Sequence, residues 1–136
     1  MTEAAAKESP SILVVEDEVL IRMVIADYLR RCGYKVIEAA GADEAVAVLG
    51  REDVVLDVVL SDVEMPGTMD GFALARWIRA RRPGLPVVLV GSPQRAAEAA
   101  GDLCENGPML AKPYDPQLAA NRIKQLLAAH AARANS

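Results

Sequence analysis

Short apolar runs that do not alternate with polar residues limit the folds open to this chain. Such runs occur at residues 12–15, 34–37, 57–61, 86–90 and 108–111. Strands that are apolar along their whole length are buried on both faces, which is typical of a parallel sheet covered by helices on each side. Each run is followed by a segment with helix signals, so the order strand–helix repeats five times. The pattern therefore predicts an α/β fold: a doubly wound (βα)5 parallel sheet.

Helix signals fill the segments between the runs. Apolar residues recur at helical spacing, Gly33 and Gly50 follow where two of the helices should end, and Asp115-Pro116 is a favourable helix start. The predicted helices cover about residues 20–28, 45–49, 72–82 and 93–100, with a last helix from 115.

Length and charge exclude several classes of protein. The 136 residues suit one domain, predicted over 10–134 after a frayed tail at 1–9. An apolar fraction of 52% excludes disorder of the whole chain, and a net charge of -4 argues against nucleic acid as a direct partner. No run approaches the roughly 18 apolar residues of a membrane span, and residues 1–10 do not resemble a signal peptide.

The two cysteines give a further expectation. Cys32 and Cys104 do not form a CxxC motif. They predict neither a disulfide framework nor a zinc site, and a reducing, cytoplasmic environment is the simplest interpretation.

Charged residues follow three of the predicted strands directly. Glu16 and Asp17 come after the first strand, Asp62 after the third and Lys112 after the fifth. Because the carboxyl ends of parallel strands meet at one edge of a sheet, these side chains should lie close together. Crowded carboxylates need a cation to stay ionised, and hard oxygen ligands suit Mg²⁺. A carboxylate beside Mg²⁺ and a lysine is also an arrangement for phosphoryl transfer.

Several motifs together resemble the receiver domains of two-component response regulators. They are VVEDE (14–18), DVVLSDVEMPG (57–67), MDG (69–71), LPVVLV (85–90) and AKPY (111–114). The resemblance covers about residues 11–130. It implies a flavodoxin-like fold with strand order 2-1-3-4-5.

The resemblance assigns a phosphoacceptor and a Mg²⁺ site. Asp62 would accept the phosphoryl group and also bind the metal. Asp17 would bind Mg²⁺ directly and Glu16 through water, while the backbone carbonyl of Glu64 would be a further ligand. The carboxylate of Glu64 lies where it could influence the attacking water in this family.

The predicted phosphoryl-binding and switch residues depart from the family pattern. Lys112 would bind the phosphoryl group, aimed by a cis bond to Pro113. The family's Thr or Ser after the fourth strand is replaced by Gly91, and Ser92 comes one residue later. The family's switch aromatic is replaced by Met109. Phosphorylation is thus expected, whereas the usual output switch is in question.

The resemblance also implies partners and a role. A histidine kinase or a histidine phosphotransfer protein would phosphorylate Asp62. Since no room for an output domain follows residue 136, a stand-alone receiver would signal through an unknown downstream protein, or act as a relay or phosphate sink. The family reports through the face made by the helix at 93–100, the strand at 108–111 and the last helix, which also leaves a homodimer open. No enzymatic activity is expected beyond self-catalysed phosphorylation and dephosphorylation.

Two other functions stay open at this point. Gly91 and Met109 favour an interaction module that keeps the fold without phosphorylation. A Mg²⁺-dependent phosphohydrolase with an aspartyl nucleophile uses the same residue types. Its DxDx(T/V) signature follows the first strand, however, whereas Asp62-Val63-Glu64 follows the third.

Overall fold

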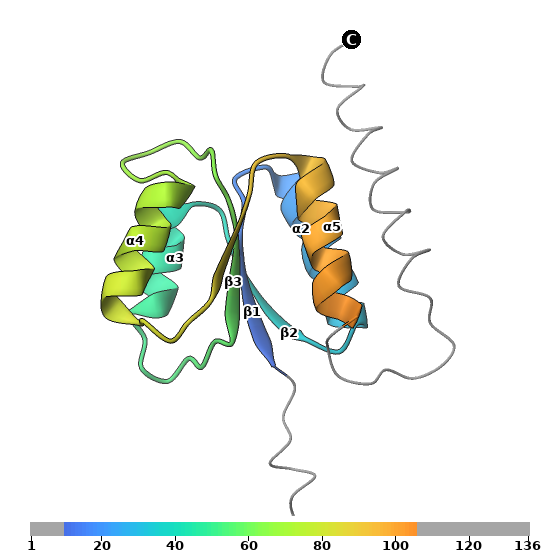
Figure 1. The fold of residues 1–136 in the computed structure, drawn as a ribbon, viewed down its shortest axis with the longest axis horizontal. Coiled ribbons are helices and arrows are strands. Elements are labelled where there is room, and N and C mark those ends of the chain that lie inside the picture. Colours follow the sequence, from blue (N-terminus) through green and yellow to red (C-terminus); the bar gives the residue numbers. More distant parts are fainter. Residues whose placement is uncertain (1–9, 106–136) are drawn as a thin grey trace, which may run out of the picture.

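A four-stranded parallel sheet lies between two pairs of helices (Figure 1). A computed structural model describes residues 10–105. The strand order is β2-β1-β3-β4, which confirms the predicted order for these strands. The predicted strand at 108–111 and the last helix lie outside the described residues. The elements are β1 (Ser11–Val15), α2 (Val19–Arg31), β2 (Lys35–Ala39), α3 (Ala42–Leu49), β3 (Val58–Asp62), α4 (Gly71–Arg81), β4 (Val87–Val90) and α5 (Pro93–Glu105).

The register of the sheet brings its carboxyl ends to one edge. Val15, the last residue of β1, is level with Ala39 in β2 and with Ser61 in β3. Asp62, the last residue of β3, is level with Val90 at the end of β4. The residues that follow β1, β3 and β4 therefore emerge side by side.

Alternate residues of the central strand feed two separate cores. Ile12 and Val14 pack into the core beneath α2 and α5, which cover one face of the sheet (Figure 1). Leu13 and Val15 pack into the core beneath α3 and α4 on the other face. All four side chains are almost completely buried. Because successive side chains of a strand point to opposite faces, a run without alternation is what two covered faces require.

Several element boundaries differ from the prediction, and two of them lie on the sheet edge and helix that matter for the site. Asp62 was expected in a loop, but it is the last residue of β3. The helix expected at 93–100 continues through Gly101 to Glu105. Glycine inside a helix costs about 1 kcal/mol, and packing outweighs it here, because Ala97, Ala100 and Cys104 are buried against the α2 side of the sheet.

The expectation that the two cysteines stay unpaired is wrong. Cys32 at the end of α2 and Cys104 in the last turn of α5 form a disulfide, with their Cα atoms 5.5 Å apart. Both residues are buried. Their separation of 72 residues hid this pairing, which depends on α2 and α5 packing side by side on one face. The cysteines therefore do not support a reducing compartment.

None of the helices within residues 10–105 is both long and apolar enough to cross a bilayer.

Reducing the Cys32–Cys104 bond is expected to lower the free energy of unfolding by about 3 kcal/mol, since the bond restricts a long loop in the unfolded chain. Urea denaturation of the oxidised and the reduced protein measures the difference. A Cys32→Ala/Cys104→Ala variant is the control, and reductant should leave its midpoint unchanged. Equal midpoints for the oxidised and reduced wild type would contradict this expectation.

Candidate functional site

Three carboxylates meet at the carboxyl edge of the sheet. Glu16 and Asp17 directly follow β1, and Asp62 ends β3. One carboxylate oxygen from each residue lies within 4.8 Å of the others. The structure thus brings together the acidic residues that the strand order predicted. Lys112, Pro113 and Met109 lie outside the described residues.

Glu16 is the buried member of this group. Its side chain is 8% exposed, and its Oε2 accepts a hydrogen bond from the backbone N–H of Glu18 at 3.1 Å. Burial raises the pKa of Glu16 to about 8, and the negative charges of Asp62 and Asp17 add to this rise, while the Glu18 N–H opposes it. Glu16 therefore holds its proton near neutral pH unless a cation compensates.

Opposing effects act on the pKa of Asp62 as well. Burial raises the pKa of the Asp62 carboxyl, and the charge of Asp17 adds to the rise. The backbone N–H of Glu64 donates to Asp62 Oδ1 at 3.3 Å and works in the opposite direction. The cluster offers hard oxygen donors with excess negative charge, a donor set that fits Mg²⁺. Binding a divalent cation would favour the ionised forms of Glu16 and Asp62.

The metal-free protein is expected to lose stability as the pH rises from about 5 to about 8. In the unfolded chain Glu16 ionises near pH 4.5, whereas in the folded protein it keeps its proton up to about 8. The folded state binds more protons in this window, so the free energy of unfolding decreases with pH. Thermal unfolding in the presence of a chelator measures the slope.

Glu16→Gln should make this slope shallower, because the amide does not titrate. Glu52→Gln, which changes an exposed glutamate, is the matched control and should keep the wild-type slope. A wild-type slope in Glu16→Gln would show that Glu16 is not responsible.

The backbone around Asp62 is fixed by close packing. The N–H of Val63 donates to the carbonyl of Val90 at 3.0 Å, and the N–H of Gly71 donates to the carbonyl of Val63 at 2.8 Å. A Cβ atom added to Gly71 would lie 2.8 Å from the Cα of Val63 and would clash with the carbonyl oxygen of Asp62. Sequence reasoning used Gly71 only as part of the MDG motif and missed this role. Its signal was a glycine just after the helix-capping Asp70.

Gly71→Ala is expected to destabilise the protein by about 2 kcal/mol, because the backbone at Asp62 has to move. Gly84→Ala is the matched control: a Cβ added there meets no atom within 4 Å, so its effect should stay within about 0.5 kcal/mol. Chemical denaturation compares the two variants. Equal stabilities would exclude close packing as the reason for glycine at position 71.

Gly91 and Ser92 follow β4, where the family pattern predicts a switch hydroxyl. A Cβ added to Gly91 would meet no atom within 4 Å, so no packing demands a glycine there. The Oγ of Ser92 accepts a hydrogen bond from the backbone N–H of Arg95 at 3.2 Å, and its carbonyl accepts from Ala96 at 2.9 Å. Ser92 thus caps the start of α5. Its hydroxyl has a structural task that does not require a phosphoryl group.

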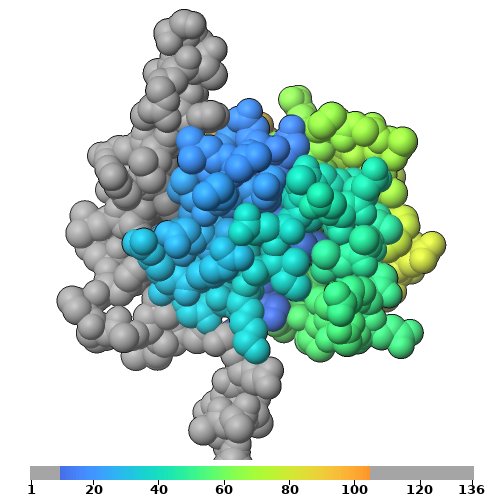
Figure 2. Space-filling model, turned by 180° about the vertical axis from the view of Figure 1, so that it is seen from behind, coloured from blue at the N-terminus to red at the C-terminus, as the bar shows by residue number. Residues whose placement is uncertain are grey.

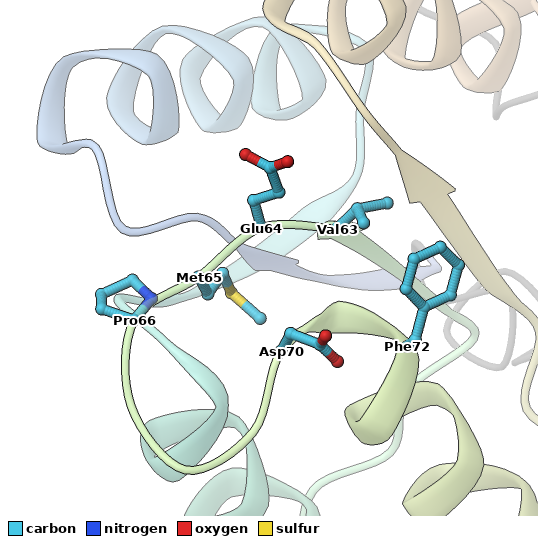
Figure 3. A pocket seen from close by; sticks show the side chains of 6 residues that line it. All are labelled: Val63, Glu64, Met65, Pro66, Asp70 and Phe72. Carbon is cyan, nitrogen blue, oxygen red and sulfur yellow. The ribbon is translucent and has the colours of Figure 1, made fainter.

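An open pocket of about 530 Å³ lies at the segment between β3 and α4 (Figure 3). Asp70 uses Oδ1 to accept the N–H of Ala73 at 2.9 Å, which caps α4. Phe72 is 52% exposed, and the Glu64 side chain points away from Asp70 (Figure 3). Two residues of its wall, Val63 and Glu64, directly follow Asp62 in the chain. The pocket is lined by Val63, Glu64, Met65, Pro66, Asp70 and Phe72.

This chain belongs to the response regulator receiver domain family, whose model matches residues 12–124. Such domains act in two-component signalling, and the family is in general not enzymatic. The match confirms the resemblance carried by the sequence motifs. It gives no support to the phosphohydrolase alternative.

Curated relatives combine this domain with other parts. The chain is 36% identical to the transcriptional regulatory protein ResD of Bacillus subtilis, over 85% of this chain and 47% of ResD. It is 37% identical to the response regulator FleR of Pseudomonas aeruginosa, over 88% of this chain and 24% of FleR. It is also 36% identical to the sensor histidine kinase RcsC of Salmonella typhi, over 96% of this chain and 13% of RcsC. The chain thus spans less than half the length of these relatives.

Solved receiver structures share the fold. A receiver domain from Clostridium thermocellum aligns with a TM-score of 0.58 and 27% identity, covering 87% of this chain and 98% of the other. The response regulator TrrA of Thermotoga maritima, solved in complex with Mg²⁺ and BeF, aligns with a TM-score of 0.56 and 26% identity, covering 86% and 98%. These alignments confirm the flavodoxin-like parallel fold.

Proposed function

We propose that this chain accepts a phosphoryl group on Asp62 with the help of Mg²⁺. The observation that carries the proposal is the meeting of Glu16, Asp17 and Asp62 at the carboxyl edge of the sheet. The family match and the Mg²⁺–BeF complex of the similar TrrA support it. In this proposal Asp17 and Asp62 would bind the metal directly and Glu16 through water. The Glu64 backbone carbonyl would be a further ligand.

The chemistry requires an ionised Asp62. Its carboxylate oxygen attacks the phosphorus of a phosphohistidine, an O–P bond forms, the P–N bond breaks, and the imidazole leaves with the electron pair. Mg²⁺ supplies neutralisation of the phosphoryl oxygens and of the carboxylates around them. The Glu64 N–H already donates to Asp62 and orients the attacking side chain. Lys112 is proposed to bind the phosphoryl group, aimed by a cis bond to Pro113.

The proposed donor is a histidine kinase or a histidine phosphotransfer protein. The solved complex of the histidine kinase ThkA with TrrA, with a TM-score of 0.55 and 31% identity over 61% of this chain, supports a kinase partner. On α2, Val19 is 58% exposed and Met23 is 55% exposed. They line, together with Asp17, an open surface beside the carboxylates. An apolar surface at this place suits a partner that brings its phosphohistidine to Asp62.

The output is proposed to be contact with an unknown downstream protein, or a relay or phosphate sink. Gly91 has no hydroxyl and Ser92 caps α5, which favours the relay or sink. The same observation favours a second candidate function, that of an interaction module that works without phosphorylation. A cytoplasmic location is part of the proposal and is supported by the role of the family in two-component signalling. Homodimerisation through the face that contains α5 belongs to the proposal as well.

Incubation with Mg²⁺ and acetyl phosphate is expected to add the mass of one phosphoryl group to the wild-type protein, measured by intact mass spectrometry. Asp62→Asn should show no adduct, because an amide is not a nucleophile for phosphorus. Asp53→Asn is the matched control: it changes an exposed aspartate outside the acidic cluster and should be phosphorylated normally. A chelator should prevent the reaction.

Two results would contradict the proposal. A wild-type protein without an adduct would favour the phosphorylation-independent module. An adduct that persists in Asp62→Asn would place the acceptor elsewhere.

A further inference from the structure

Arg22 connects the acidic cluster to the edge strand of the sheet. It belongs to the first turn of α2, and its side chain is only 15% exposed. Its Nη1 donates to the backbone carbonyl of Glu16 at 2.8 Å. Its Nε donates to Oε1 of Glu38, in β2, at 3.3 Å. One guanidinium thus bridges the β1–α2 connection and β2.

The hydrogen bond from Arg22 to the Glu16 carbonyl affects the orientation of the backbone from which Asp17 extends. The N–H of Glu16 donates to the carbonyl of Ala39 at 3.0 Å, and the Glu16 side chain accepts from Glu18. Arg22 binds the remaining backbone group of Glu16. The peptide unit that joins Glu16 to Asp17 contains this carbonyl and is planar. Fixing the carbonyl therefore fixes the plane from which Asp17 extends.

Arg22 contacts the backbone of the acidic cluster and not its carboxylate oxygens. Within residues 10–105, no ion pair joins a basic side chain to Glu16, Asp17 or Asp62. Arg22 instead pairs with Glu38, which balances a largely buried positive charge. The oxygens of the cluster are thereby left for a cation while their backbone is held in place.

A second arginine on the same helix offers a built-in comparison. Arg30 pairs with the other oxygen of Glu38 at 3.1 Å and donates to the carbonyl of Val36 at 3.1 Å. Its side chain is 47% exposed, and no hydrogen bond joins it to Glu16. Figure 2 shows the blue surface of α2 beside the cyan surface of the segment that follows it, the region that both arginines bridge. Arg30 thus shares the partner of Arg22 without its contact to the site.

We propose that Arg22, held by Glu38, is the positioning residue that fixes the Glu16–Asp17 peptide for divalent-cation binding. The proposal rests on the proposed function, since the cation serves Asp62 phosphorylation. Lysine does not replace arginine fully, because a single ammonium lacks the planar fork that reaches a carbonyl and a carboxylate at once.

The test uses Mn²⁺ as the probe and electron paramagnetic resonance as a readout independent of phosphorylation. Arg22→Met is expected to weaken Mn²⁺ binding about tenfold, the lower range for losing a group that orients metal ligands. Arg22→Lys should give an intermediate value. Arg30→Met is the matched control, because it removes the other bridge to Glu38, and it should keep wild-type affinity. With acetyl phosphate, Arg22→Met should need more Mg²⁺ for half-maximal rate but reach the wild-type rate at saturation.

Wild-type Mn²⁺ affinity in Arg22→Met, or an equal loss in Arg30→Met, would overturn the positioning role. If Arg22→Met fails to fold by circular dichroism, Arg22→Lys and Glu38→Gln decide. Weaker Mn²⁺ binding in both supports the proposal, and unchanged binding in both overturns it. A wild-type protein that binds Mn²⁺ yet gains no phosphoryl group on Asp62 would refute the proposed function and leave the positioning role standing.

Discussion

The parallel pairing of β1 with both of its neighbours is the constraint on which the rest of the structure depends. The register that aligns Val15 with Ala39 and Ser61 brings the carboxyl ends of the strands level. Glu16 and Asp17 leave β1 at this level, and Asp62 ends β3 beside them. A shift of one residue would turn an apolar side chain out of one core and into the other. The packing of both cores therefore sets the geometry of the acidic cluster.

Placing three carboxylates together raises the free energy of the ionised site, and the surrounding backbone counteracts this. Burial and mutual repulsion raise the pKa values of Glu16 and Asp62. Backbone N–H groups of Glu18 and Glu64 donate to these carboxylates and oppose the rise. The remaining conflict is what a divalent cation would relieve. In the proposed function, the site would thus be pre-arranged for its cation.

The side of the sheet that carries α5 holds the features that bear on the output switch. Ser92 caps the helix, and Gly91 provides no hydroxyl for a phosphoryl group to attract. The Cys32–Cys104 disulfide also ties the end of α5 to α2. The helix α5 is therefore anchored at both of its ends. This restraint agrees with the proposed relay or sink role, in which the domain receives a phosphoryl group without a large change of shape.

The sequence alone determined the parallel α/β fold and the candidate ligands, because both follow from local patterns: apolar runs without alternation, and charged residues such as Asp17 and Asp62 at their ends. It did not determine contacts between residues distant in the chain. The Cys32–Cys104 bond and the bridge from Arg22 to β2 exist only once helices pack on the sheet. Those contacts depend on distances in three dimensions, which spacing along the chain does not encode. The tertiary structure therefore decided how the acidic site is held.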